Sequence, residues 1–341
     1  MNDLKQAIKE KARQLGFHLA GVTSSEPPAY FPKFEAWLEA GMHGRMEYLS
    51  SERSRHRRAD PKHILPECKS ILVLGIPYPP PASGAGAKIA SYALGRDYHD
   101  VLPGRLKSMV SYIEAKLGHP FPYKLYTDSG PILERELGQR AGLGWIGKNS
   151  CLIHPNRGST FFLAEILLGI ELEADEPFPA DHCGSCTRCE DACPTQCILP
   201  DRTLDARPCI SYLTIELKEE IPTVLRPQIG NWVFGCDICH QVCPWNRFAP
   251  TADPAFEPLI PLPLRTSDLR LTQQEFRTRF NHTPVKRAKR AGFLRNLSVV
   301  TGNTGDETDI PLLEDVSHQK PFPGEHAHWA IGRIHERSTA Q

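Results

Sequence analysis

Two cysteine-rich runs constrain the fold of this chain more than any other feature of its sequence. The first run, HCGSCTRCEDACP, begins at His182, and the second, CDICHQVCP, begins at Cys236. The first carries four cysteines and the second three, and each ends in a Cys-Pro pair. Where a matching fourth cysteine would stand, the sequence has Val233. The pattern indicates paired metal sites, one of which lacks a ligand within its own run.

The spacing C-x-x-C-x-x-C-x-x-x-C-P is typical of bacterial ferredoxins. In such a run three closely spaced thiolates hold one iron–sulfur cluster, and the fourth cysteine, before the proline, is a ligand of the other cluster. The two runs therefore predict two 4Fe-4S clusters that exchange ligands. The predicted ligands are Cys183, Cys186, Cys189 and Cys243 for cluster 1, and Cys193, Cys236, Cys239 and one further cysteine for cluster 2.

The further ligand of cluster 2 has to come from outside the two runs. Cys209 lies between them and is our choice, because the segment after it can be interpreted as an insertion that separates it from its partners. Cys197, four residues after Cys193, is the alternative. Structural zinc is an alternative for the whole set, although zinc sites are usually built from paired C-x-x-C knuckles without the Cys-Pro ending.

The pattern of apolar and charged residues divides the chain into three predicted domains. Residues 1–170 predict an α/β domain, in which apolar runs beginning at Ser70 and Phe161 are buried strands with helices between them. Residues 171–265 form a ferredoxin-like domain. Residues 266–341 predict an all-α domain whose first helix is capped by Ser267, with a weak internal similarity that favours HEAT-like helical repeats.

Composition excludes some classes of protein. The 341 residues carry a formal net charge of zero, so a nucleic-acid interface has to be local. The first seventeen residues predict an amphipathic helix and not a secretion signal, and no apolar run approaches the roughly 20 residues that span a bilayer. We expect a cytoplasmic monomer without a membrane segment.

A glycine-rich stretch, AGLGWIGKNS, resembles two phosphate-binding motifs. Both motifs need a strand before the glycines and a helix after them. Here a helical segment comes first and a strand-like one follows, and Asn149 replaces the Ser/Thr of a P-loop. We reject both motifs and expect a tight turn, which could place Lys148 and Asn149 against a large cofactor.

Several segments together resemble the epoxyqueuosine reductase family. They are YTDSGPILERELGQRAGLGWIGKNSCLIHP, GSTFFLAEILL, HCGSCTRCEDACPT and NWVFGCDICHQVCPWN, and their order extends the likeness through most of the chain. The family implies a cobalamin-binding α/β domain similar to that of reductive dehalogenases, the two-cluster domain with Cys209 on cluster 2, and a helical-repeat domain. It implies the last step of queuosine biosynthesis, in which cob(I)alamin, supplied with electrons through the two 4Fe-4S clusters, reduces epoxyqueuosine in the tRNA anticodon loop.

The resemblance also implies site residues. Asp128 corresponds to the proton donor of the family, whereas the residues around it, DSGP before a helix, also fit an N-terminal cap. An acid that donates near neutral pH needs a raised pKa, which we expect from burial by cobalamin and substrate. Arg58 corresponds to a position near the corrin, with a solvated basic face as the alternative. Tyr98 and His154 are further candidates, with ordinary packing as the alternative for each. The D-x-H-x-x-G cobalamin motif is absent, which the family tolerates.

A basic stretch in the predicted helical domain is the candidate tRNA interface. From Arg277 to Arg295 it holds seven Lys/Arg and no acid, which suits a phosphate backbone but also an ordinary solvated face. The predicted contacts are Lys286, Arg287, Lys289, Arg290 and Arg295. The resemblance also implies an external electron donor, which the sequence does not identify.

Three other functions fit parts of the sequence less well. A reductive dehalogenase would carry a twin-arginine signal and no basic helical tail. A ferredoxin-like carrier would not need about 170 residues ahead of its clusters. An RNA-binding protein with structural metal would not need the Cys-Pro endings.

Overall fold

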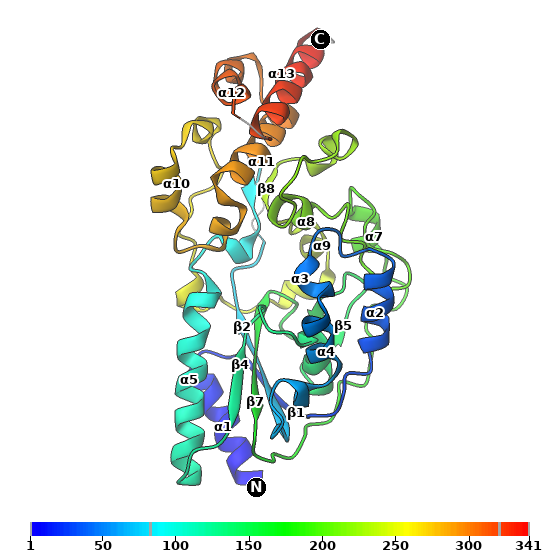
Figure 1. Ribbon diagram of the computed structural model, residues 1–341, viewed down its shortest axis with the longest axis vertical. Coiled ribbons are helices and arrows are strands. Elements are labelled where there is room, and N and C mark those ends of the chain that lie inside the picture. Colours follow the sequence, from blue (N-terminus) through cyan, green and yellow to red (C-terminus); the bar gives the residue numbers. More distant parts are fainter. Residues whose placement is uncertain (1, 82–83, 320–321, 340–341) are drawn as a thin grey trace.

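The computed structural model describes residues 2–81, 84–319 and 322–339 of an elongated molecule with its termini at opposite ends (Figure 1). Its α-helices are α1 (Asn2–Gln14), α2 (Phe31–Glu39), α3 (Glu47–Ser50), α4 (Glu52–Ala59), α5 (Tyr98–Leu117), α6 (Glu134–Arg140), α7 (Arg188–Ala192), α8 (Ile210–Ile215), α9 (Ile238–Gln241), α10 (Gln273–Phe280), α11 (Lys289–Thr304), α12 (Ile310–Ser317) and α13 (Pro323–Thr339). None of the helices in this part of the chain is long and apolar enough to cross a membrane.

The central sheet of the N-terminal half has the strand order β1-β2-β7-β4, and all its neighbours are antiparallel. The strands are β1 (Leu19–Ser24), β2 (Ser70–Pro77), β3 (Lys88–Ile89), β4 (Tyr123–Tyr126), β5 (Trp145–Ile146), β6 (Leu152–Ile153), β7 (Phe161–Leu168) and β8 (Trp232–Phe234). The two buried strands predicted from Ser70 and Phe161 are confirmed as β2 and β7. The mixture of helices and strands is as predicted, but this sheet lacks the parallel strands of a typical α/β fold.

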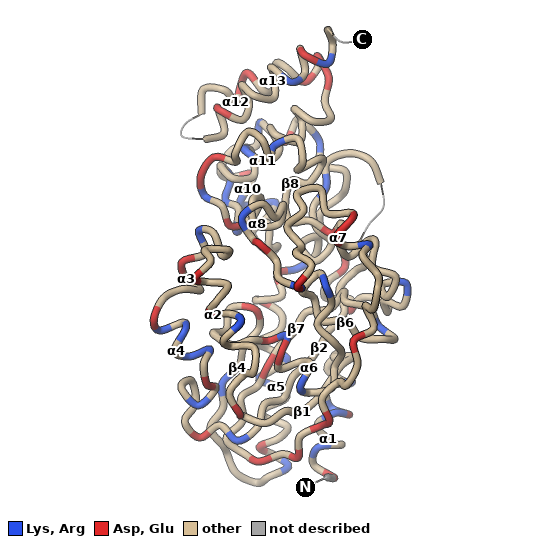
Figure 2. Tube along the Cα trace, turned by 90° about the vertical axis from the view of Figure 1, so that its right-hand side faces the viewer, with Lys and Arg blue, Asp and Glu red and all other residues tan. Residues whose placement is uncertain are grey.

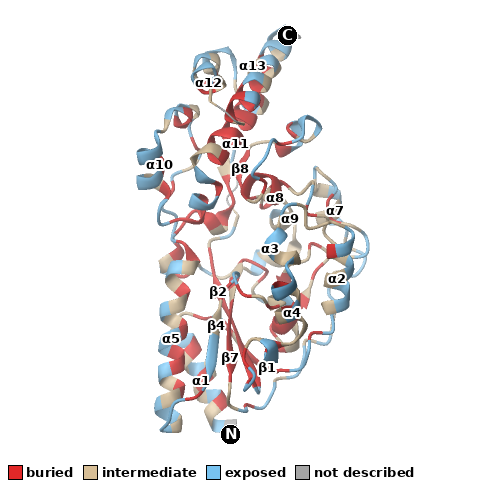
Figure 3. Ribbon diagram, in the orientation of Figure 1, coloured by how far each residue is buried: buried red, intermediate tan, exposed pale blue. Residues whose placement is uncertain are grey.

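Each face of this sheet is covered by helices. Because side chains alternate along a strand, Leu72 and Leu74 of β2 join the core under α1 and α5, whereas Ile71 and Val73 join the core under α6. All four side chains are fully buried, as the red strands in Figure 3 show. The sheet is therefore a rigid platform, and the loop between β4 and α6 stands at its edge.

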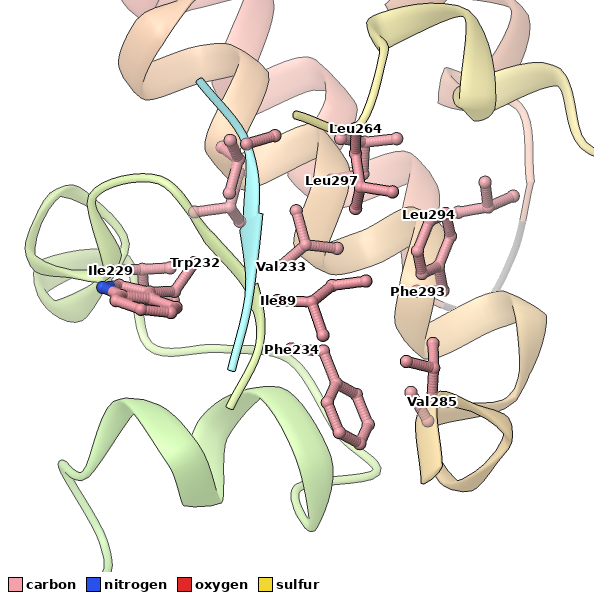
Figure 4. Close-up of a cluster of buried hydrophobic side chains, with 14 of the residues drawn as sticks. Ile89, Ile229, Trp232, Val233, Phe234, Leu264, Val285, Phe293, Leu294 and Leu297 are labelled. Carbon is pink, nitrogen blue, oxygen red and sulfur yellow. The ribbon is translucent and has the colours of Figure 1, made fainter. Parts of the chain in front are cut away.

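A second core joins the cysteine-rich segment to the C-terminal helices. β3 pairs in parallel with β8, and α11 packs against β8 and α8. Figure 4 shows Ile89, Val233 and Phe234 facing Phe293 and Leu297 of α11. Val233, at the position of the missing cysteine, is fully buried among these apolar side chains. The predicted boundary between residues 265 and 266 stays a prediction, since this core extends across it.

The start of the C-terminal helices differs from the prediction. Residues Thr266–Arg270 form a 3-10 turn, and α10 begins only at Gln273. Its cap is Thr272, whose hydroxyl accepts from the N–H of Glu275 while the Glu275 carboxylate accepts from the N–H of Thr272. The prediction of Ser267 as the cap is wrong, because the cap of the helix is Thr272, five residues later, where this reciprocal pair satisfies the first amides of α10.

Candidate active site

Four of the predicted cluster ligands line one cavity of about 250 Å³: Cys183, Cys186, Cys189 and Cys243. Cys243 reaches it from the second run because α9 packs against α7. The indole Nε1 of Trp145 donates a hydrogen bond to Sγ of Cys183 at 3.4 Å. The thiols stand around the cavity, and in the described part of the chain no three His, Cys, Asp or Glu side chains converge on one point.

The other predicted ligands gather at the start of α8, where Cys209 is the residue before the first helical turn. The Cys197 thiol lowers the pKa of Cys209, and the backbone amides of the first turn of α8 act in the same direction. Burial raises the pKa of Cys236 to about 12, with a contribution from the nearby Cys209 and Cys193 thiols. Cys239 is half-buried and lies near Cys236 and Cys209. Cys197 also belongs to this group, since its Sγ lies 3.4 Å from Sγ of Cys193. Both candidates for the fourth ligand are therefore in place.

Asp128 lies in the loop between β4 and α6, in the left-handed backbone region with φ of 57°. The loop is tied down at both ends: Thr127 Oγ1 donates to the Leu163 carbonyl at 2.9 Å, and the N–H of Asp128 donates to Glu134 Oε1 at 2.6 Å. The residue that precedes α6 is Leu133, and no side chain caps this helix. The capping interpretation of Asp128 is therefore wrong, and its carboxylate is free for other contacts.

The first residues of α5 reach the Asp128 carboxylate. The hydroxyl of Tyr98 donates to Asp128 Oδ2 at 2.9 Å, and Nε2 of His99 lies 3.5 Å from the same oxygen. His99 is oriented by Asp97, whose Oδ1 is 2.8 Å from Nδ1 of the imidazole. Tyr98 is buried and stacks on Phe162 with ring centroids 4.3 Å apart. Sequence analysis selected Tyr98 but missed His99; the available signal was Asp97, two residues earlier, as an N-cap that fixes the His99 backbone.

The charges of this group follow from its hydrogen bonds. Burial works to raise the pKa of Asp128, but hydrogen bonds from His99 and Tyr98 outweigh it and hold that pKa below its usual range. Hydrogen bonds with Asp128 and Asp97 raise the pKa of His99 to about 9. The protein alone therefore holds a carboxylate beside an imidazolium at neutral pH, the opposite of the raised Asp128 pKa that we expected. The expected rise depended on a cover of cofactor and substrate, and the Asp128 side chain is 59% exposed without one.

Arg58 binds the backbone of the loop that carries Asp128. Its guanidinium donates to the Gly130 carbonyl at 3.4 Å and to the Ser54 hydroxyl, and it lies 5.5 Å from the ring centre of Phe34. The residue is only 8% exposed, so it is no part of a solvated face although it stands in the basic helix α4. Figure 2 shows Lys and Arg along α4.

Three other predicted cofactor contacts lie apart from Asp128. Lys148 and Asn149 line the cavity with the cluster 1 thiols, and the buried Nδ2 of Asn149 has no hydrogen-bond partner among the described residues. Burial lowers the pKa of His154 to about 4, and its Nδ1 accepts from the N–H of Asn156, so the ring is neutral. The structure thus brings Tyr98 and Arg58 to the Asp128 loop, and Lys148 and Asn149 to the cavity lined by the four predicted cluster 1 cysteines.

The five predicted tRNA contacts have different surroundings. Lys286 is 2.9 Å from Asp97, and Arg287 forms two hydrogen bonds with Glu216. Arg290 donates to the Leu271 carbonyl and to Gln319, while Lys289 is exposed. Arg295 is only 1% exposed, and its guanidinium donates to the carbonyls of Leu213, Leu217 and Glu219. A guanidinium placed in this way has no donor for phosphate, so Arg295 holds α11 against α8 and is removed from the proposed interface.

Known proteins match the chain over almost its whole length. Residues 182–246 match a 4Fe-4S double cluster binding domain, and residues 58–129 match the epoxyqueuosine reductase QueG family. An epoxyqueuosine reductase of Pseudomonas aeruginosa is 41% identical over 97% of this chain and 94% of its own length. The Escherichia coli K12 epoxyqueuosine reductase is 38% identical over 100% of this chain and 92% of its own length.

Solved structures give the same result. A crystal structure of an epoxyqueuosine reductase with a tRNA-Tyr epoxyqueuosine-modified tRNA stem loop superposes with a TM-score of 0.89 at 31% identity, covering 98% of this chain and 90% of that chain. The Bacillus subtilis epoxyqueuosine reductase, with its catalytic aspartate loop swung out of the active site, superposes with a TM-score of 0.86 at 30% identity, over 98% and 91% of the two chains.

The double-cluster domain and the carboxylate–imidazole site beside it define an iron–sulfur oxidoreductase. The identities and the coverage of the relatives make this assignment narrower. The chain belongs to the epoxyqueuosine reductase family.

Proposed function

We propose that this chain reduces epoxyqueuosine to queuosine in the anticodon loop of tRNA, the last step of queuosine biosynthesis. The observation that carries the proposal is the convergence of Tyr98 and His99 on one oxygen of Asp128, within a fold that superposes on a tRNA-bound relative over its whole length. Removal of the epoxide oxygen breaks two C–O bonds and forms one C=C bond. It consumes two electrons and two protons and releases water.

Asp128 is the proposed proton donor to the epoxide oxygen. Its carboxylate is exposed, and its own backbone is in the left-handed region of a loop. The catalytic aspartate loop of the Bacillus subtilis relative has been seen swung out of the active site. The proton comes to Asp128 from the imidazolium of His99, which shares the same carboxylate oxygen. Substrate and cofactor that cover the loop would remove water from Asp128, which makes its protonated form more stable.

The proposed iron–sulfur ligands are the eight cysteines predicted from the sequence. Cluster 1 is held by Cys183, Cys186, Cys189 and Cys243, which share one cavity. Cluster 2 is held by Cys193, Cys209, Cys236 and Cys239. The choice of Cys209 over Cys197 is supported by the free amides at the start of α8, which stabilise a thiolate at Cys209. An external one-electron donor, whose identity the chain does not reveal, would reduce the clusters.

Cobalamin is the proposed cofactor at the end of this electron path, where it would supply a strongly reducing cobalt centre. The protein between cluster 2 and Asp128 fits a ligand with many amide groups, such as a corrin. The buried hydroxyls of Ser91 and Thr160 have no hydrogen-bond partner among the described residues. Tyr92, the residue after Ser91, packs edge-on against Tyr98. Of the predicted contacts, Tyr98 and Arg58 belong to this region. The likeness of the domain to reductive dehalogenases stays a prediction.

The proposed tRNA interface is the group Lys286, Arg287, Lys289 and Arg290, of which the first three are exposed and Arg290 is half-buried. Lys286 and Arg287 connect this surface to the active site, since Lys286 contacts Asp97, the partner of His99. Phosphate groups would compete with Asp97 and Glu216 for these two side chains. The modified nucleotide has to leave the loop stack to reach Asp128, as in other enzymes that act on a base.

The test is reconstitution of the protein with iron, sulfide and cobalamin without oxygen, followed by incubation with an epoxyqueuosine-modified tRNA stem loop and a chemical one-electron donor. We expect about eight irons per chain, four for each cluster, one bound cobalamin and formation of queuosine. Cobalamin and iron without queuosine would contradict the proposed substrate. Iron without cobalamin would contradict the proposed cofactor.

A further inference from the structure

A fully buried acid lies under the Asp128 loop, and the reaction described above does not use it. Glu165 stands in the middle of β7, paired in register with Val73 of β2 and Tyr126 of β4. Its exposed fraction is zero, and neither carboxyl oxygen forms a hydrogen bond of ordinary geometry with a described residue. An ionised carboxylate without a partner is strongly disfavoured in such a place, so Glu165 is a neutral acid that carries a proton.

Glu165 points to the face of the sheet that carries the active-site loop. The strand alternates, and its neighbours on that face, Leu163 and Leu167, belong to the core covered by α6. The carboxyl of Glu134, the first residue of α6, lies beside Glu165. Oε1 of Glu134 in turn accepts a hydrogen bond from the N–H of Asp128. Glu165 and Glu134 thus lie carboxyl beside carboxyl, and the backbone N–H of Asp128 links Glu134 to the catalytic loop.

The charges around this pair keep a proton in it. Burial, followed by the charge of Glu134, raises the pKa of Glu165 well above its usual value. Burial, followed by the charge of Asp128, raises the pKa of Glu134 to about 7. The charged groups around the pair are Asp128 in the loop, the guanidinium of Arg58 on α4 and that of Arg135 on α6 itself, and the arginines favour the ionised form of Glu134 only weakly. The pair therefore holds at least one proton at neutral pH.

The proposed reaction needs such a store. Two protons are consumed for each epoxide oxygen released as water, and the Asp128 carboxyl can deliver only one before it has to be recharged. Once tRNA and cofactor cover the loop, exchange with bulk water is restricted. A second proton has to come from a group that is already protonated and lies next to Asp128 inside the protein.

We propose that Glu165 and Glu134 store the second proton of the reaction and return it to Asp128 from the side of the sheet. Glu165 gives its proton to the Glu134 carboxylate, and Glu134 passes a proton to the Asp128 carboxylate after the first transfer to the oxygen. Both acids are recharged from solvent when the product leaves. Glu165 and Glu134 touch no substrate and are proton-storing residues. This inference rests on the proposed function only for its role, since the stored proton itself is a property of the chain alone.

The first readout needs neither cofactor nor substrate. Infrared spectra of the cofactor-free protein at pH 7 should show the C=O band of a protonated, buried carboxylic acid, shifted in D2O and lost in Glu165→Gln. Glu136→Gln is the matched control, because Glu136 is 4% exposed, lies on the same helix as Glu134 and accepts two backbone N–H groups. It should leave the band unchanged. A wild-type spectrum without this band, or a band that survives Glu165→Gln, would overturn the proposal.

The second readout is the pH profile of turnover by the reconstituted enzyme. Glu165→Gln should lower turnover by at least about 10-fold at pH 8 and less at pH 6, where solvent protons are more abundant, a smaller loss than that of a direct acid. A wild-type profile in Glu165→Gln would overturn the proposal, whereas a wild-type enzyme that forms no queuosine would contradict the proposed function and leave the infrared result to decide on the stored proton. If Glu165→Gln does not fold, Glu134→Gln, at the half-buried helix end, should shift the same band and give the same profile.

Discussion

The hydroxyl of Tyr98 donates to Oδ2 of Asp128 at 2.9 Å, and this bond fixes the charge of the candidate acid as well as its position. A donor to the carboxylate stabilises its ionised form, and together with His99 it overcomes the effect of burial on the Asp128 pKa. Asp128 is therefore ready to accept a proton from His99 and needs a covered site to pass it on. Tyr98 and His99 together thus set the charge and the position of the Asp128 carboxylate.

Asp128→Asn should abolish most of the turnover, because asparagine fills the same space but has no carboxyl proton to give. We expect a loss of about 10²- to 10⁴-fold in kcat, the usual range for a general acid. The control is Ser129→Ala, in the same loop, whose hydroxyl donates to the Thr127 carbonyl. Turnover of Asp128→Asn close to that of Ser129→Ala would remove Asp128 from the proposed role.

His99 should make the stability of the cofactor-free protein depend on pH. Its pKa is raised from about 6.5 in the unfolded chain to about 9 by Asp128 and Asp97. The contribution to stability is thus complete below about pH 6.5 and is lost as the pH rises through 9.

The measurement that checks this is the difference in the free energy of unfolding between wild type and His99→Gln from pH 6 to above pH 9. We expect wild type to be more stable at pH 6 by about 1 kcal/mol, a modest value because the side chain is 34% exposed, and the difference to vanish above pH 9. Other titrating groups, among them Lys286 near Asp97, are common to both proteins and cancel. A difference that does not change with pH would contradict the assigned imidazolium.

The sequence constrains the cluster ligands more closely than it constrains the acid site, for physical reasons. Cysteine spacing is local information, because each run has to wrap its own cluster. Glu165, in contrast, stands in the apolar run FFLAEILL, where a strand is predicted correctly but a single acid looks like a solvent-facing residue. Both faces of this sheet are covered by helices, so most side chains of the strand, Glu165 among them, are buried, and that arrangement is known only from the fold.

The basic stretch from Arg277 to Arg295 shows the same limit. The residues of α11 from Gly292 to Gly302 are buried on every side of the helix. The order of polar and apolar residues there therefore does not reveal which charged side chain faces water. Lys286 and Lys289 are exposed as predicted, whereas Arg295 is enclosed by the carbonyl groups at the end of α8. Only the packing of α11 against α8 separates a tRNA contact from a structural arginine.

The iron content of two cysteine variants should show whether Cys209 or Cys197 is the fourth ligand of cluster 2. Cys209→Ser should lose one cluster, which leaves about half of the iron of the reconstituted wild type, because serine is a poor ligand for iron in a 4Fe-4S cluster. Cys197→Ser is the matched control, since its thiol lies in the same group of cysteines, and it should retain all the iron. Loss of iron from Cys197→Ser with full retention in Cys209→Ser would reverse the assignment.

Lys289→Ala should weaken tRNA binding without changing its specificity. Lys289 is exposed and takes part in none of the ion pairs formed within the described residues, so it is available for phosphate. Loss of one phosphate contact should reduce the slope of log affinity against log salt by about 1. Lys116→Ala, in the last turn of α5 near the N-terminal end of the molecule (Figure 1), is the control and should leave the slope unchanged. Equal slopes for wild type and Lys289→Ala would exclude this contact.

Arg295→Met should destabilise the protein and leave tRNA affinity unchanged. Methionine fills much of the same space but leaves the carbonyls of Leu213 and Leu217 without donors, at a cost of about 3 kcal/mol. The control is Arg270→Met, on the same C-terminal segment, which breaks an exposed ion pair with Asp315 and should cost less than about 0.5 kcal/mol. Denaturant unfolding measures the stability, and tRNA titration at a temperature where both variants are folded measures the affinity. A variant of wild-type stability with weakened tRNA binding would return Arg295 to the interface, whereas the expected result assigns it to the joint between α8 and α11.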